Sequence, residues 1–127
     1  NIILAGRSIN DSIASQLAVE IKNKINKKIK KNKIKLLIMG FTFKENCSDF
    51  RNTKVIDIYE RLTNFGFSVD IFDPWIDRVK TQKEYKSAKL RIIKKIKKNC
   101  YSSIVLCVSH DYFPRLHSDS AQYFFLS

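Results

Sequence analysis

An apolar run that stops at a glycine constrains the fold of this chain more than any other stretch. Residues 34–39 are apolar apart from one lysine, and Gly40 ends the run. A polar loop carrying Lys44 and Arg51 follows, and apolar residues take up helical spacing near Thr53. A buried strand, a loop and a helix in this order open a βαβ unit. In sheets built from such units, ligands bind beyond the carboxyl ends of the strands, so we expect this loop to lie at a ligand site.

The remaining segments continue the alternation of strand and helix. Apolar residues at every fourth position predict a long amphipathic helix from Ile13 towards the lysines before Lys33. The very first residues also have the pattern of a helix interior. Two more strands are predicted at residues 67–72 and 104–108, and two more helices at residues 53–65 and over much of 77–99. Strands of near-continuous apolar character are typical of a parallel sheet covered on both faces, so the predicted class is α/β.

Lys44 and Arg51 are the candidate binding residues of the loop. Two fixed cations beside a helix N-terminus suit an anion, most simply a phosphate group. A dinucleotide site is rejected for this piece, because Gly40 is not followed by the second and third glycines of the G-x-G-x-x-G turn. Asp73 ends the next strand but lies 33 residues after Gly40, against an expected spacing of about 20. A plain surface role for Lys44 stays open beside phosphate binding.

The cysteines and one histidine are the remaining candidates for chemistry, and the sequence favours structural roles for them. Cys47, Cys100 and Cys107 are odd in number and form no C-x-x-C pair, which argues against a disulfide framework or zinc site and favours a reducing compartment. Cys100 and Cys107 adjoin an apolar run and are expected in the core. Cys47 lies in the loop but has no neighbouring His to activate it. His110 follows the strand at 104–108 and is either an acid–base group or a hydrogen-bonding residue.

Arg7, Asn10 and Asp11 are spaced three to four residues apart near the start of the chain. If a helix already runs through them, they share one face and could point at a ligand. The alternative is an ordinary helix start with Ser8 or Asn10 as its cap, and the spacing alone favours this alternative.

The net charge of +12 raises the question of an anionic partner. Much of it falls in two lysine runs, residues 22–35 and 80–98, where lysine alternates with isoleucine as on a solvated helix face. We therefore favour a solvated surface, and a basic nucleic-acid-binding module stays open as an alternative function. No apolar run approaches the roughly 18 residues of a membrane span. Residue 1 is Asn, so we expect a piece of a longer chain.

Several motifs in the chain resemble one known family. Residues 40–58, Gly-Phe-Thr-Phe-Lys-Glu-Asn-Cys-Ser-Asp-Phe-Arg-Asn-Thr-Lys-Val-Ile-Asp-Ile, resemble the motif that opens the C-terminal domain of the UDP-glucose/GDP-mannose dehydrogenase family. Residues 4–11, 73–75 and 108–111 also look like the branch that oxidises UDP-N-acetylhexosamines for bacterial surface polysaccharides. The motifs occur in the right order, and the match covers roughly residues 1–116.

The resemblance implies a Rossmann-like parallel sheet with flanking helices that binds the UDP part of the substrate. Residues 1–33 would end the central, dimer-forming helical region, 34–116 would form the UDP-sugar-binding domain, and 117–127 would be an atypical tail. The whole enzyme would be cytoplasmic, with an N-terminal domain that binds NAD and a cysteine that forms a thioester. It would oxidise the sugar C6 alcohol to a carboxylate with two NAD. This piece would lack the NAD-binding domain and the catalytic cysteine and would be inactive alone.

The resemblance also implies roles for particular residues. Lys44 matches the family lysine that contacts the substrate, and Arg51 matches the arginine that closes the same motif, for loop order or substrate contact. Arg7 lies in the part that resembles the interdomain helix, which would join two or more copies of the chain. Cys47 does not match the catalytic cysteine.

The end of the chain departs from the family pattern. The family continues into another strand with an Asp-x-Lys-Gly-like ending, and residues 117–127 do not fit it. This departure leaves open whether the last strand is present, and Tyr123 to Leu126 are expected to form a sticky tail. A third reading follows, in which the chain is a remnant of the dehydrogenase that serves in oligomerisation or has no function.

Overall fold

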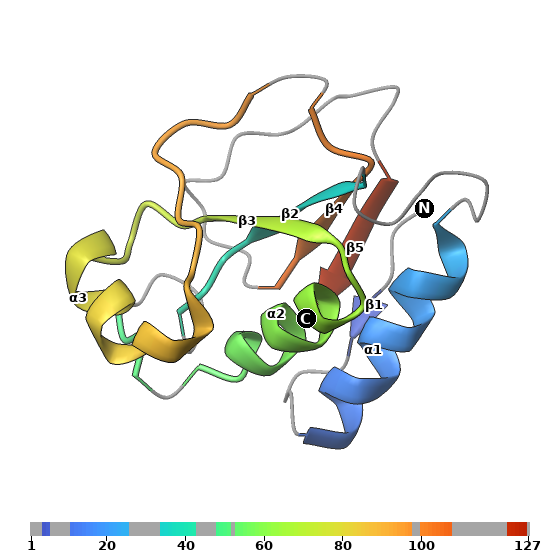
Figure 1. The fold of residues 1–127 in the computed structure, drawn as a ribbon, viewed down its shortest axis with the longest axis horizontal. Coiled ribbons are helices and arrows are strands. Elements are labelled where there is room, and N and C mark those ends of the chain that lie inside the picture. Colours follow the sequence, from blue (N-terminus) through green and yellow to red (C-terminus); the bar gives the residue numbers. More distant parts are fainter. Residues whose placement is uncertain are drawn as a thin grey trace.

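The computed structural model describes residues 4–5, 11–25, 34–42, 48–51, 53–97, 100–107 and 122–126. Within these residues the chain forms a five-stranded sheet of order β1-β5-β4-β2-β3 with helices beside it (Figure 1). The strands are β1 Leu4–Ala5, β2 Lys35–Met39, β3 Ser68–Phe72, β4 Ser103–Leu106 and β5 Gln122–Leu126. The helices are α1 Asp11–Lys24, α2 Val55–Asn64, α3 Arg78–Glu84 and the 3₁₀ turn η2 Lys86–Ala88.

Every pair of neighbouring strands in this sheet runs parallel, which confirms the predicted α/β, Rossmann-like class. From β2 the chain passes through α2 to β3 on one side, and it returns to β4 on the other side of β2. The strand order therefore reverses at β2. In open parallel sheets the crevice at such a reversal, beyond the carboxyl ends of the strands, is the usual ligand site.

The two faces of the sheet are covered in different ways. Helices α1 and α2 run side by side and cover the face that carries Leu36 and Ile38 (Figure 1). The opposite face carries Leu37 and Met39. Its cover comes from the irregular segment before β4, whose packed hydrophobic residues are Ile93, Ile96 and Tyr101.

The prediction of a helix over much of residues 77–99 is correct only for its first part. Lys89 adopts a left-handed backbone with φ 53° and ends the helical turns. Beyond it, Ile93 N donates to the Ile71 carbonyl at 2.8 Å, and Ile71 N donates to the Arg91 carbonyl at 2.8 Å. β3 would otherwise be an open edge, and the β-branched Ile92 and Ile93 suit the extended backbone that covers it.

The structure also corrects two expectations about the ends of the chain. Leu4 and Ala5 belong to β1 and not to a helix interior, since α1 begins at Asp11. Residues 122–126 form β5 between β1 and β4, so the sheet does contain a strand after β4. Aromatic residues favour strands, and a partner on each side satisfies the β5 backbone, so these residues do not form a loose tail. The predicted division at residues 33 and 116 stays a prediction.

In the parts of the chain that the structure describes, no helix combines the length and the apolar character needed to cross a bilayer.

Candidate functional site

The turn that leaves β2 is held by the carboxylate of Asp73, the residue that follows β3. Asp73 Oδ2 accepts hydrogen bonds from the backbone N–H of Phe41 at 2.7 Å and of Thr42 at 3.2 Å. Its Oδ1 accepts from Trp75 N at 2.8 Å. Gly40 makes the turn possible with φ 89°, a value that glycine adopts readily. The acid at the end of β3 therefore shapes the loop.

The far end of the same loop is held by Tyr85, which follows α3. The Tyr85 hydroxyl donates to the Phe50 carbonyl at 2.7 Å, with the Arg51 carbonyl oxygen at 3.1 Å. The Tyr85 ring also meets Phe41 edge to face, with ring centroids 5.6 Å apart. Asp49 Oδ1 accepts from Arg51 N at 3.0 Å and closes a tight turn beside these bonds. One side chain thus touches both the entry and the exit of the loop.

Burial raises the pKa of the Tyr85 phenol, and the nearby carboxylates of Glu84, Asp49 and Asp57 raise this pKa further. The phenol therefore keeps its proton at neutral pH and stays a donor to the loop carbonyls.

Helix α2 begins directly after the loop, so its positive end lies beside the loop. Thr53 is buried, and its hydroxyl oxygen accepts from Val55 N at 3.1 Å in the first turn. The sequence therefore places a polar loop and a helix N-terminus next to each other at the carboxyl end of β2, as expected for an anion site.

A hollow of about 480 Å³ opens between this loop and α3. Its lining residues are Ser48, Asp49, Phe50, Arg51 and Lys80. Arg51 was predicted as a binding residue, and its exposed side chain lines this hollow. Lys80 was not predicted, because it was grouped with the solvated lysine run. Lys80 could have been identified from its position in the helix that begins just after the carboxyl end of β3.

The other predicted site residues lie outside the described parts of the chain. These residues are Arg7 and Lys44, and the same holds for Cys47 and His110, for which structural roles were favoured. Their roles stay predictions.

Two of the cysteines can be placed. Cys107 is buried, as predicted, and burial raises the pKa of its thiol, so it is no nucleophile at neutral pH. Cys100 is exposed, so its expected place in the core is wrong, because the chain turns inward only at the following residues. Among the described residues no group of side chains could hold a metal ion.

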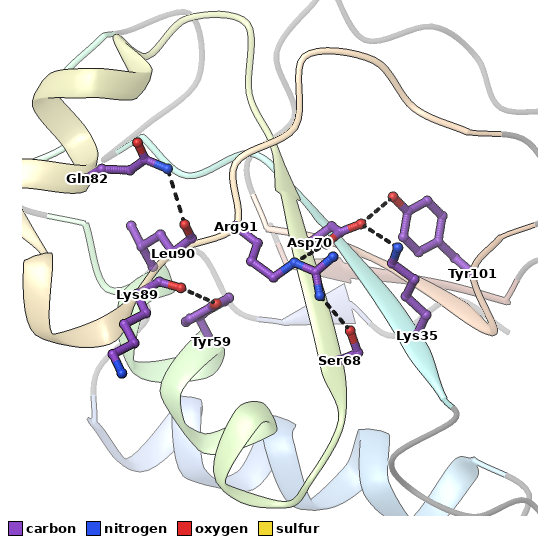
Figure 2. Close-up of polar contacts among 9 residues, drawn as sticks. All are labelled: Lys35, Tyr59, Ser68, Asp70, Gln82, Lys89, Leu90, Arg91 and Tyr101. Atoms are coloured by element: carbon purple, nitrogen blue, oxygen red, sulfur yellow. Dashed lines mark hydrogen bonds and ion pairs between the residues drawn. The ribbon is translucent and has the colours of Figure 1, made fainter.

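A second polar cluster surrounds Asp70, a buried acid in the middle of β3 (Figure 2). Asp70 Oδ2 lies 3.2 Å from Lys35 Nζ and accepts from the Tyr101 hydroxyl at 2.8 Å. Asp70 Oδ1 lies 3.3 Å from Arg91 Nε, and Arg91 also donates to Ser68 Oγ at 3.2 Å. Burial and the hydrogen bond to Asp70 raise the pKa of the Tyr101 phenol.

The Asp70 cluster has a structural role. Lys35 is the first residue of β2 and Tyr101 precedes β4, so the cluster lies towards the amino ends of the strands, away from the usual ligand edge. It fastens the segment before β4 to the sheet. Two further bonds fix the approach to Arg91, from the Tyr59 hydroxyl to the Lys89 carbonyl at 3.2 Å and from Gln82 Nε2 to the Leu90 carbonyl at 3.3 Å (Figure 2).

Comparison with protein-family models confirms the resemblance suggested by the motifs. Residues 37–124 match the model of the UDP-glucose/GDP-mannose dehydrogenase family, UDP binding domain. The chain is 39% identical over 124 residues to a UDP-N-acetyl-D-glucosamine 6-dehydrogenase of Salmonella typhi, covering 97% of this chain and 28% of that protein. It is 35% identical over 120 residues to the Pseudomonas aeruginosa protein of the same name, covering 94% and 28%. The chain thus spans less than a third of the length of these relatives.

A solved structure supports the fold. The chain superposes on a structure described as the UDP-N-acetyl-mannosamine dehydrogenase Cap5O from S. aureus with a TM-score of 0.60 and 21% identity. The match covers 92% of this chain and 30% of that one. At this identity the likeness bears on the fold alone.

We expect Asp70→Asn to lower the free energy of unfolding by about 1–3 kcal/mol, because it leaves Lys35 and Arg91 without their buried partner. Urea unfolding measures this change. Glu60→Gln removes one negative charge from the exposed side of α2 and should stay within about 0.5 kcal/mol. Equal losses in the two variants would show that the cluster adds no stability.

The Tyr101 phenol should make stability depend on alkaline pH. Its folded pKa is raised above the unfolded value of about 10. The stability it contributes is therefore fully present below about pH 10 and is lost as pH rises towards the folded pKa. The stability difference between the unaltered chain and Tyr101→Phe should accordingly shrink as the pH rises from about 10 to about 12. A difference that stays constant over this range would contradict the assignment.

Tyr85→Phe should loosen the loop while keeping the ring contact with Phe41. We expect a loss of about 1 kcal/mol in unfolding free energy and faster amide hydrogen exchange at residues 48–51. Tyr59→Phe is the matched control, because it also loses a phenol-to-carbonyl bond, but at Lys89. If both variants change exchange at 48–51 equally, Tyr85 does not anchor the loop.

Proposed function

Because the chain belongs to the UDP-glucose/GDP-mannose dehydrogenase family, we propose that it is the UDP-sugar-binding part of an NAD-dependent nucleotide-sugar 6-dehydrogenase. The observation that carries the proposal is the loop after β2. The loop contains the family motif, leaves the sheet at its carboxyl edge, and has Asp73 at its entry and Tyr85 at its exit. A tethered loop beside a helix N-terminus is suited to hold a diphosphate in one position.

The binding roles follow from charge. Lys44 and Arg51 hold the diphosphate, Arg51 with a planar guanidinium that can donate two parallel hydrogen bonds and Lys44 as a point charge. Arg7 is the third candidate for substrate contact, on the grounds of its charge and of the motif at residues 4–11. The hollow beside Arg51 supports this picture, because it offers space next to that cation.

The described residues do not fit NAD. The turn at Gly40 lacks the further glycines that let a pyrophosphate approach, and Asp73 is occupied by loop amides. NAD would accept the hydrides in another part of the whole enzyme, where a cysteine carries the covalent chemistry. The whole enzyme would oxidise the C6 alcohol of a UDP-N-acetylhexosamine to a carboxylate for surface polysaccharide synthesis. We expect it to be a cytoplasmic homodimer or larger homo-oligomer joined through the N-terminal helix, and the 127-residue chain alone to bind without oxidising.

Titration of UDP into the chain, followed by amide chemical shifts, tests the proposal. UDP should shift residues 40–51, and Lys44→Ala and Arg51→Ala should each weaken binding by about tenfold, as expected for a lost charge-assisted contact to phosphate. Lys94→Ala, which removes an exposed cation from the segment before β4, is the control.

An absent response at about millimolar UDP, or equal binding by all three variants, would refute the proposal. Binding of DNA with a steep salt dependence would instead favour the basic nucleic-acid module. Loss of all ligand binding in a folded chain would favour the remnant.

A further inference from the structure

The hollow beside the loop has a second cationic wall. Arg51 lines it from the loop, and Lys80 lines it from α3, which follows another strand. Both residues are exposed, so both side chains can reach a ligand in the hollow. Among the described lining residues, Asp49 is the one carboxylate, and its Oδ1 accepts a bond from Arg51 N. Two cations against one carboxylate in this described part of the lining favour an anion.

The backbone of Lys80 is fixed. Asp77 caps α3, and its Oδ1 accepts from Lys80 N at 3.0 Å. The Asp77 carbonyl accepts from Thr81 N at 2.9 Å and from the Thr81 hydroxyl at 2.7 Å. Thr81 is fully buried, so the first turn of α3 cannot rotate without exposing it. The stem of the Lys80 side chain therefore starts from a defined point at the rim of the hollow.

The two walls are also joined to each other. Tyr85 directly follows α3, and its hydroxyl bonds to the carbonyls of Phe50 and Arg51 at 2.7 and 3.1 Å. The helix that carries Lys80 and the loop that carries Arg51 are thus held at a set separation. Cations that are held in place before binding lose less entropy when they meet an anion.

We propose that Lys80 is a second phosphate-binding cation of the substrate site and contacts the diphosphate of a nucleoside diphosphate ligand together with Arg51. This inference rests on the proposed function and adds to it a residue from α3. A volume of about 480 Å³ lies within the range of roughly 300–1,000 Å³ that is common for small-molecule sites.

The competing explanation is that Lys80 is one more lysine of a solvated surface. Lys83 provides the comparison, because it lies one turn further along α3, is exposed, and is not among the residues that line the hollow. Substitution of either residue by Gln removes the same charge from the same helix. Only the position relative to the hollow differs.

The test compares Lys80→Gln and Lys83→Gln in the 127-residue chain by titration with UDP, uridine and inorganic pyrophosphate. Lys80→Gln should weaken UDP and pyrophosphate binding by about three- to fivefold, the upper part of the range for one exposed ionic contact. It should leave uridine binding unchanged. Lys83→Gln should change the affinity for UDP by less than about twofold.

Equal UDP affinities in the two variants, while the unaltered chain binds UDP, would overturn the role of Lys80 and leave the proposed function standing. If pyrophosphate binds in a Lys80-dependent way and UDP shows no preference over it, the anion site stands and the proposed nucleotide function fails. If neither UDP nor pyrophosphate binds to the unaltered chain, both are refuted.

Discussion

The carboxylate of Asp73 is the group on which the site depends. Strand pairing positions β2 and β3 but leaves the direction of the chain beyond them undetermined. By accepting from amides of Phe41, Thr42 and Trp75, Asp73 joins the turns that leave two neighbouring strands. An acid at this point of a Rossmann-like sheet can instead bind a ribose, as in dinucleotide domains. Here the acid at this position binds backbone amides of the protein. The carboxyl edge of the sheet can still be a ligand site, but this carboxylate orders the loop there.

The tether at Tyr85 has a complementary effect. Asp73 joins the turns after two adjacent strands. Tyr85 instead joins the loop to the residue that follows α3. This makes α3 part of the loop's environment, although the helix itself is short and mostly exposed. A small domain can order a long surface loop in this way, because a few hydrogen bonds hold the loop and no additional apolar core is needed.

Apolar patterning located β2, α2, β3 and β4 to within a residue or two, because α2 buries one face and the strands are covered on both faces of the sheet. It failed over residues 90–97, where Leu90, Ile93 and Ile96 have helical spacing. Leu90 instead packs into the core beside α2, and Ile93 and Ile96 pack on the second face of the sheet. The backbone between them pairs with the edge of β3 through Ile92, a tertiary contact that spacing does not reveal. β1 and β5 escaped prediction because their pairing is non-local. The motif identified Arg51, but Lys80 and the partners of Asp70 come together only through the fold.

The position of β5 has a consequence for how the chain reaches its native state. β5 pairs with β1 through Leu4 and Phe125, so a segment near residue 4 must meet one near residue 125 that is made later. Closing so long a loop costs chain entropy before any contact is gained, whereas β2, α2 and β3 form a compact local unit. During synthesis on the ribosome, that unit can assemble early while one side of β4 has no neighbour. Such an open strand is a template for wrong pairing, so this half of the sheet is where the nascent chain is most exposed to aggregation.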